Sequence, residues 1–251
     1  MIRNKTKVSI ITPVFNNEKF ISDAIKSVNS QSYDFIEHII IDGNSKDKTK
    51  DLVKSLMSKN AILKSENDNG IYNALNKGLD LSSGELIGIL HSDDIFNNEN
   101  VIMNVVNFFE SKNYDFIYGN ICYVKKNDPH TIMRKWNSGK FTQKKIYHGW
   151  MPPHTGTFIK KDLFTKHGKY DENYNISADY DLLLRLLRME NLIVGYLPET
   201  ITMMRSGGKS NKSILNILNK MYEDYLILKR NNIGGILTLV NKNLSKIRQF
   251  I

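Results

Sequence analysis

The sequence is poor in the features that mark several classes of protein. Its 251 residues include one cysteine, Cys122, so no internal disulfide can form, and the apolar neighbours of Cys122 indicate a small buried thiol. No apolar run reaches the roughly 18 residues that a membrane-spanning helix needs. The charged N-terminus leads directly into an expected strand rather than into the apolar core of a signal peptide. These features predict a cytoplasmic protein with an ordinary hydrophobic core.

Glycine is missing where a dinucleotide-binding enzyme would carry it. The first expected strand leads into Thr12-Pro13-Val14-Phe15-Asn16, with proline and phenylalanine in place of a glycine-rich loop. Gly208-Lys209-Ser210 matches the end of a P-loop, but Met203 occupies the position of that motif's first glycine. We therefore interpret this loop as a cover over an anionic ligand, with Lys209 and Arg205 as candidate contacts.

Strand and helix patterns alternate in the first half of the chain. The apolar spacing predicts strands at 7–12, 35–41, 61–65 and 85–90, and helices at 17–31, 47–59 and 71–81. Pro13 is expected to end the first strand. Short connections between alternating strands and helices predict an α/β fold, in which a mostly parallel sheet is flanked by helices.

The pattern changes after residue 94. Helices are expected at 95–112, 161–167 and 178–189, a strand at 114–118, a hairpin at 120–141, and short strands at 191–197 and 200–205. No repeat or low-complexity linker interrupts the chain. We predict one domain over 1–210, divided into halves at 1–95 and 96–210, followed by a helical tail at 211–251 that is broken near Gly234-Gly235.

Two adjacent carboxylates, Asp93 and Asp94, end the fourth expected strand. They repel each other and are costly to desolvate, so they need a cation, hydroxyl groups or water nearby. A divalent cation that also holds a diphosphate would meet this need. The alternative interpretation is that Asp94 caps the helix expected at 95–112.

Polar clusters follow three of the expected strands, at 12–16, 42–45 and 92–94. Because the carboxyl ends of parallel strands meet at one edge of a sheet, these clusters are expected to line one cleft. Phe15 could stack on a flat heterocycle while Asp42 accepts its hydrogen bond. Alternatively, Phe15 packs in the core and Asp42 forms a turn with Gly43.

Five blocks of the sequence resemble the inverting family 2 glycosyltransferases of GT-A fold. The blocks are VSIITPVFN at 8–16, DGNSKDKT at 42–49, ENDNGIYNALNKG at 66–78, SGE at 83–85 leading to SDD at 92–94, and ADYDL at 178–182. The resemblance covers roughly residues 7 to 210 and implies a Rossmann-like GT-A fold. It also implies transfer of a sugar from a nucleotide-sugar donor.

The resemblance implies roles for individual residues. Thr12, Phe15 and Asp42 would hold the nucleotide base, usually uracil, with Pro13 and Asn16 in the same block. Asp68, Gly70 and Asn76 belong to the block that would lie beside the diphosphate and donor sugar. Asp93 would face the ribose or donor sugar, and Asp94 would bind Mg²⁺ or Mn²⁺.

Asp179 matches the family's catalytic base. The family usually has an acidic pair here, and Ala178 replaces the first acid, so Asp181 remains a second candidate; it is also an ordinary acid of a first helical turn. Trp150, His154 and Gly156 are candidates for the acceptor side. The alternatives are core packing for Trp150 and a structural loop role for His154.

The net charge of +9 is concentrated in the tail, where residues 211–251 contain seven basic and two acidic side chains. The tail could pack on the domain with its lysines in water, or rest on anionic lipid at the inner face of the cytoplasmic membrane. Lipid contact would suit an acceptor built on a polyprenyl diphosphate.

The sequence therefore predicts a metal-dependent inverting glycosyltransferase that uses a UDP-sugar in bacterial surface-polysaccharide assembly. A sugar nucleotidyltransferase is the first alternative, but it would need a glycine-rich basic loop after the first strand. A basic nucleic-acid-binding module is the second. We expect no nucleic-acid partner, because the acids cluster where phosphates would bind.

Overall fold

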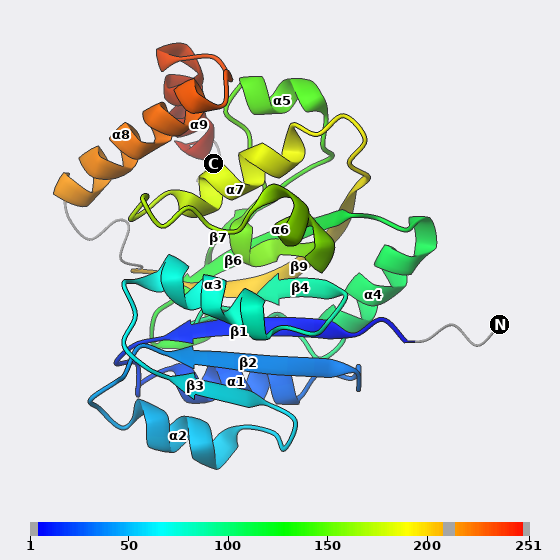
Figure 1. Ribbon diagram of the computed structural model, residues 1–251, viewed down its shortest axis with the longest axis vertical. Coiled ribbons are helices and arrows are strands. Elements are labelled where there is room, and N and C mark those ends of the chain that lie inside the picture. The colour runs from blue at the N-terminus through cyan, green and yellow to red at the C-terminus, as the bar shows by residue number, and fades with distance from the viewer. Residues whose placement is uncertain (1–4, 208–213, 248–251) are drawn as a thin grey trace.

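The computed structural model describes residues 5–207 and 214–247. Within this part of the chain the strands form one nine-stranded sheet, in the order β3-β2-β1-β4-β8-β6-β9-β5, with β7 paired to β6. Helices cover both faces of this sheet (Figure 1). Lys209, a predicted anion contact, lies outside the described residues.

The first half of the chain builds the parallel part of the sheet. Its elements are β1 (Val8–Val14), α1 (Ile21–Asn29), β2 (Ile36–Asp42), α2 (Thr49–Leu56), β3 (Ile62–Ser65), α3 (Ile71–Leu81) and β4 (Leu86–Ile89). β1 pairs in parallel with both β2 and β4. Ile11, Ile39 and Leu75 pack in the core beneath α3, whereas Val14, Ile40 and Val53 pack with α1 and α2 on the other face. The predicted α/β architecture is confirmed.

The second half extends the sheet with mixed pairing. It contains β5 (Ile95–Phe96), α4 (Val101–Lys112), β6 (Phe116–Lys125), β7 (Asp128–Trp136), α5 (Gln143–Tyr147), the 3₁₀ turn η1 (His154–Gly156), β8 (Thr157–Lys160), α6 (Lys161–His167), α7 (Ala178–Leu187) and β9 (Val194–Arg205). β8 lies antiparallel between β4 and β6, and β6 pairs in parallel with β9. β8 and α5 were not predicted from the sequence.

Pro13 does not end β1, contrary to expectation. The strand continues to Val14, and Pro13 lies opposite Ile41 of β2. Along a central strand, the backbone groups of successive residues point alternately toward the strand on one side and the strand on the other. The nitrogen of Pro13 points toward β4. The pairing of β4 with β1 ends before this position, at Ile11 and Ile89. The missing N–H therefore costs no ladder hydrogen bond.

The predicted helix start at residue 95 is also wrong. Ile95 and Phe96 form β5 against β9, and α4 begins only at Val101. Asp94 consequently caps no helix. The two short strands expected at 191–197 and 200–205 are one strand, β9, which continues through Pro198 with a shift in its register against β6.

The C-terminal helices α8 (Ile214–Arg230) and α9 (Ile236–Ile247) pack beside α7 (Figure 1). Ile227, Leu228 and Ile233 are fully buried in the same core cluster as the leucines of α7. Asp224, itself buried, pairs with Lys220 at 3.3 Å and Lys242 at 2.7 Å, which joins the two helices. Among the described helices, none is long and apolar enough to cross a membrane.

Candidate active site

The loops that follow β1, β2 and β4 are hydrogen-bonded to one another. The backbone N–H of Asn16 donates to Ser45 Oγ at 2.8 Å, and the N–H of Lys46 donates back to Asn16 Oδ1 at 2.8 Å. Asn17 Nδ2 donates to Ser92 Oγ, also at 2.8 Å. The three polar clusters therefore meet at one edge of the sheet, as the sequence predicted.

Phe15, Gly43 and Asp68 form the first part of this site. The Phe15 ring is 52% exposed, so it does not belong to the core. A Cβ added to Gly43 would lie 2.6 Å from Asp68 Oδ2 and 3.2 Å from the Phe15 ring. A larger residue at position 43 would therefore displace the Asp68 side chain. The result is an exposed aromatic face beside a carboxylate.

Asp42 and Thr12 lie behind that surface and are fully buried. The Asp42 carboxylate accepts the backbone N–H of Ser45 at 3.2 Å and the hydroxyl of Ser65 at 2.5 Å, as in the turn interpretation. Thr12 Oγ1 lies 2.9 Å from His38 Nε2. In this conformation neither side chain is exposed to a ligand, so the structure does not place Thr12 and Asp42 as direct base contacts.

Asp68 and Gly70 shape the start of α3. The N–H of Gly70 donates to Asp68 Oδ1 at 3.0 Å, and Gly70 has a φ of +111°, which favours glycine. Asn76, predicted beside the donor, donates to Tyr170 O and to Glu172, and accepts the N–H of Tyr170. Asn76 therefore fastens α3 to the loop at 168–177.

Asp93 is the more exposed of the two acids that follow β4, since Asp94 is only 3% exposed. Asp94 Oδ1 accepts the backbone N–H of Arg205 at 2.9 Å. Burial, together with the charge of Asp93, raises the pKa of the Asp94 carboxyl well above its ordinary value. Arg205 is itself buried and bonds to Asp23 and to the carbonyl of Asp93, so it is a structural cation rather than the predicted anion contact.

Asp179 lies in the first turn of α7, among aromatic and imidazole side chains. Tyr72 Oη lies 2.6 Å from the carbonyl of Ile176 and 3.2 Å from Asp179 Oδ1. Burial lowers the pKa of His91, and the charges of Asp93 and Asp179 both oppose this shift. The charges of Asp93, after β4, and of Asp179, at the start of α7, therefore both act on the His91 imidazole.

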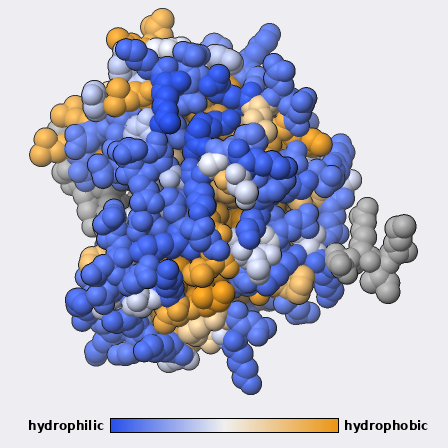
Figure 2. Space-filling model, in the orientation of Figure 1, coloured by the Kyte–Doolittle hydropathy of each residue, from blue (hydrophilic) through white to orange (hydrophobic). Residues whose placement is uncertain are grey.

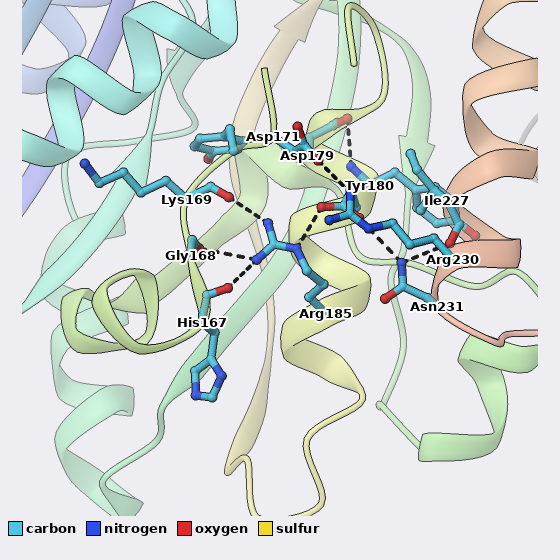
Figure 3. A network of polar contacts seen from close by, with 12 residues as sticks. His167, Gly168, Lys169, Asp171, Asp179, Tyr180, Arg185, Ile227, Arg230 and Asn231 are labelled. Carbon is cyan, nitrogen blue, oxygen red and sulfur yellow. Dashed lines mark hydrogen bonds and ion pairs between the residues drawn. The ribbon is translucent and has the colours of Figure 1, made fainter. Parts of the chain in front are cut away.

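Asp181 is fully buried and already paired. Its Oδ2 accepts Arg185 Nε at 2.7 Å, and its Oδ1 lies 3.4 Å from Asn231 Nδ2. Arg185 also donates to the backbone carbonyls of 167–169, as Figure 3 shows. Asp181 therefore stabilises the packing around α7, whereas Asp179 is the partly exposed acid of the pair.

The residues predicted on the acceptor side separate into two groups. Trp150 is half-buried against Tyr118 and donates to Ser138 O at 3.0 Å. Gly156 is buried, and a Cβ there would lie 3.1 Å from Ile121 and Pro153, so Gly156 is a packing residue. His154 belongs to the Asp179 cluster described next.

His154 Nε2 lies 2.6 Å from Tyr170 Oη, and its ring packs edge-on against His91 with centroids 6.2 Å apart. Burial lowers the pKa of His154 to about 4 despite the opposing charge of Asp179. The sequence analysis missed His91, Tyr72 and Tyr170. His91 could have been found because it directly precedes the Ser-Asp-Asp triplet, and Tyr72 lies inside a block already singled out.

The described residues contain no group of three or more histidine, cysteine or acidic side chains arranged to hold a metal ion. Asp93 and Asp94 could supply at most part of a coordination shell. Oxygen ligands from a diphosphate and from water commonly complete such a shell around Mg²⁺.

A mostly parallel sheet of this order, flanked by helices and with acids at the carboxyl ends of its strands, is a GT-A-like fold. The chain matches the family model "Glycosyl transferase family 2" over residues 9–168 and belongs to that family. An uncharacterized glycosyltransferase of Mycobacterium tuberculosis is 32% identical over 188 residues, which cover 71% of this chain and 68% of that protein. The minor teichoic acid biosynthesis protein GgaB of Bacillus subtilis is 31% identical over 70% of this chain but only 20% of its own length.

Solved structures show the same fold at low sequence identity. S. aureus TarS 1-349 in complex with UDP-GlcNAc superposes with a TM-score of 0.71 at 18% identity, covering 90% of this chain and 65% of that one. The mannosyltransferase PcManGT from Pyrobaculum calidifontis, in complex with GDP-Man and Mn²⁺, gives a TM-score of 0.67 at 14% identity over 96% and 70%.

Proposed function

We propose that this protein is a metal-dependent inverting glycosyltransferase that moves a sugar from a UDP-sugar to an acceptor hydroxyl. The observation that carries this proposal is that His91, which precedes Asp93 and Asp94 after β4, packs against His154, and that the charge of Asp179 at the start of α7 acts on both imidazoles. One acid can serve the donor diphosphate while the other faces an acceptor across a short gap.

The donor would bind along the edge where the loops after β1, β2 and β4 meet. The exposed Phe15 ring offers a stacking face for a nucleotide base, and the adjacent Asp68 offers a carboxylate for polar groups of the donor. Support for uridine comes from the TarS complexes with UDP-GlcNAc and UDP, which share this fold. Asp42 would act from behind this surface by fixing the turn through Ser45.

A divalent cation fits the chemistry of the acids after β4. Asp94 is buried beside Asp93, and the like charges oppose ionisation of Asp94, a conflict that a cation would remove. Asp93 and Asp94 would hold Mg²⁺ or Mn²⁺ together with diphosphate oxygens. Such a cation would offset the negative charge that grows on the leaving diphosphate as the glycosidic bond breaks. The Mn²⁺ complex of PcManGT supports this assignment.

Asp179 would act as the base. Its carboxylate removes the proton of the acceptor hydroxyl while the hydroxyl oxygen attacks the anomeric carbon, the bond to the diphosphate breaks, and the configuration inverts in one displacement. Tyr72 and Tyr170 stay protonated, because burial and the charge of Asp179 raise the pKa of both phenols. His91 and His154 stay neutral near pH 7 and leave the negative charge of Asp179 available.

The acceptor would be a glycan or a polyprenyl-diphosphate-linked sugar in surface-polysaccharide assembly. The teichoic acid biosynthesis protein GgaB and the PGL/p-HBAD biosynthesis glycosyltransferases are named for cell-envelope products, which supports this class of pathway. A lipid-linked acceptor would require the enzyme to work at the cytoplasmic membrane surface.

The tail would provide that membrane contact through an apolar rather than a basic face. Large apolar side chains of α8 and α9 are 39% to 80% exposed: Leu215, Ile217, Leu218, Met221, Tyr222, Ile236, Leu237 and Val240. Both helices lie at one end of the molecule, where Figure 2 shows hydrophobic surface among hydrophilic side chains. Three tail cations are instead held in ion pairs, Lys220 and Lys242 with Asp224, and Arg230 with Asp171. The exposed Lys144 of α5 would meet anionic headgroups.

The proposed donor and metal are tested together by a thermal-shift screen of nucleotide sugars with and without Mn²⁺. We expect stabilisation by UDP-sugars that grows when Mn²⁺ is added. Membrane contact is tested by co-sedimentation with phosphatidylglycerol vesicles. We expect binding by the wild type and little by Leu215→Ser/Leu218→Ser, whereas self-association without vesicle binding would identify the apolar face as a dimer interface.

A further inference from the structure

We propose that Glu223 of α8 is a positioning residue for Asp179, so that the C-terminal tail is part of the catalytic unit. This inference rests on the proposed role of Asp179 as the base. The relevant contact is between the middle of α8 and the backbone that leads into α7.

One carboxylate binds three consecutive backbone N–H groups. Glu223 Oε1 accepts from Asn175 at 2.9 Å, and Oε2 accepts from Ile176 at 2.9 Å and Ser177 at 2.8 Å. Hydrogen bonds to a charged acceptor are stronger than those between neutral groups. These bonds fix the backbone immediately before α7, and Asp179 lies two residues further on.

Glu223 binds the backbone at the entry to α7, including the N–H of the N-cap residue Ser177. Ser177 is the N-cap residue of α7, but its side chain makes no capping hydrogen bond. The first N–H groups of a helix lack partners within the helix, and a negative charge near them is favourable. A carboxylate supplied by a helix 46 residues away in the sequence therefore completes the start of α7.

The loop at 168–177 is held from two sides. On the side of α3, the Tyr72 hydroxyl contacts the carbonyl of Ile176, and Asn76 binds Tyr170. On the side of α8, Arg230 binds Asp171 at 2.6 Å, in addition to the Glu223 contacts (Figure 3 shows Arg230 and Asp171).

A groove of about 510 Å³ separates the loop from α8, lined by Tyr174 and Ile176 on one side and Tyr222 and Leu226 on the other. Glu223 and Arg230 also line this groove, and both bridge the helix to the loop by hydrogen bonds. Removing Glu223 should therefore loosen residues 175–179 while the core beneath α7, built from Ile227 and Leu228, stays intact. A displacement of about 1 Å in a catalytic group can cost roughly a hundredfold in rate.

The test compares Glu223→Gln and Glu223→Ala with Lys229→Gln, a charge change at an exposed position of the same helix. Hydrogen exchange of the amides at 175–177 should accelerate at least tenfold in Glu223→Ala and less in Glu223→Gln, which keeps one acceptor oxygen. Turnover of UDP-GlcNAc without acceptor, measured as UDP release, should fall roughly 10- to 100-fold in kcat with KM unchanged. Lys229→Gln should match the wild type.

Unchanged amide exchange at 175–177 in Glu223→Ala would overturn the inference, as would a kcat within twofold of the wild type. A matching rise in KM would also overturn it, because the residue would then act on donor binding. Asp179→Asn is measured in parallel. If Asp179→Asn retains full turnover while the Glu223 variants lose it, Asp179 is not the base. The hydrogen-exchange result would still decide by itself whether Glu223 positions the loop.

Discussion

The two halves of the candidate site are assembled in different ways. The proposed donor side consists of Phe15, Gly43 and Asp68, which follow three neighbouring parallel strands and meet because the strands end at one edge. The Asp179 side draws residues from the end of β4, from α3, from η1, and from α7 and α8. The first arrangement follows from the sheet, whereas the second depends on one loop held between two helices.

The largest effect is expected for Asp179→Asn, which tests the Asp179 side alone. The amide keeps the shape of the side chain but cannot take a proton, so turnover should fall by about 10³-fold or more while UDP binding is retained. The measurement is UDP release together with calorimetric titration of UDP. Asp181→Asn is the comparison: it should lower the unfolding temperature, because Arg185 loses a buried charged partner. Near-normal turnover in Asp179→Asn would place the base elsewhere.

The next effect concerns the cation. We expect chelation with EDTA to weaken UDP binding by about tenfold or more, and Asp93→Ala and Asp94→Ala to remove the dependence on Mn²⁺. Isothermal titration of UDP with and without Mn²⁺ measures both. Binding that is the same in all conditions would show that the two acids serve the fold or the sugar instead.

A moderate effect on the donor side is expected for Gly43→Ala. The added methyl group would lie 2.6 Å from Asp68 Oδ2 and 3.2 Å from Phe15. The Asp68 side chain can move, so stability should change little, but the Phe15–Asp68 surface would be displaced and UDP affinity should fall by roughly tenfold. Ser83→Ala, at a position on the opposite edge of the sheet, is a control for affinity. Unchanged UDP affinity in Gly43→Ala would separate this surface from donor binding.

The smallest effect concerns stability below neutral pH. Burial lowers the pKa of His38 to about 4, while the unfolded chain has an ordinary value near 6.5. The unfolded state therefore binds a proton at His38 more readily than the folded state does. The resulting contribution to the free energy of unfolding is complete above about pH 6.5. It is lost as the pH falls toward 4, by up to about 1.4 kcal/mol per pH unit.

Urea unfolding of the wild type, His38→Gln and the exposed control His148→Gln between pH 7 and 5 measures this contribution. The His38→Gln variant should show a flatter dependence on pH than the other two proteins. Equal slopes in all three would assign the acid sensitivity to other groups. His38 contacts Thr12 behind the proposed donor side, so this experiment also measures how much that contact contributes to the free energy of unfolding.

The contrast between the two sides explains what the sequence could predict. Hydrophobic periodicity predicted the parallel strands, and three polar clusters at their ends predicted the donor edge. Side-chain direction was harder to predict: Thr12 and Asp42 lie near the carboxyl ends of β1 and β2, as expected, but their side chains are buried. Ile95 and Phe96 continue a helical pattern in the sequence, yet pairing with β9 makes them a strand. Such long-range pairing leaves no local signal.

On the Asp179 side, the sequence analysis named Asp179 and His154 but not the residues that hold them. Glu223 is one acid in a basic tail, and nothing near it in the sequence indicates that it binds the backbone of 175–177. Asn76 lies in a block expected beside the donor, but its partners at Tyr170 and Glu172 are 94 and 96 residues away. Contacts of this kind require the folded chain.

The spacing of Glu223 and Arg230 has a practical consequence for protein engineering. The two residues are seven positions apart, so they lie on the same face of α8, and both bind the loop at 168–177. Inserting or deleting a single residue between them would rotate one relative to the other by about 100°. Chimeras that exchange the C-terminal segment to redirect the enzyme should therefore join the two parents after Arg230, not at the start of α8.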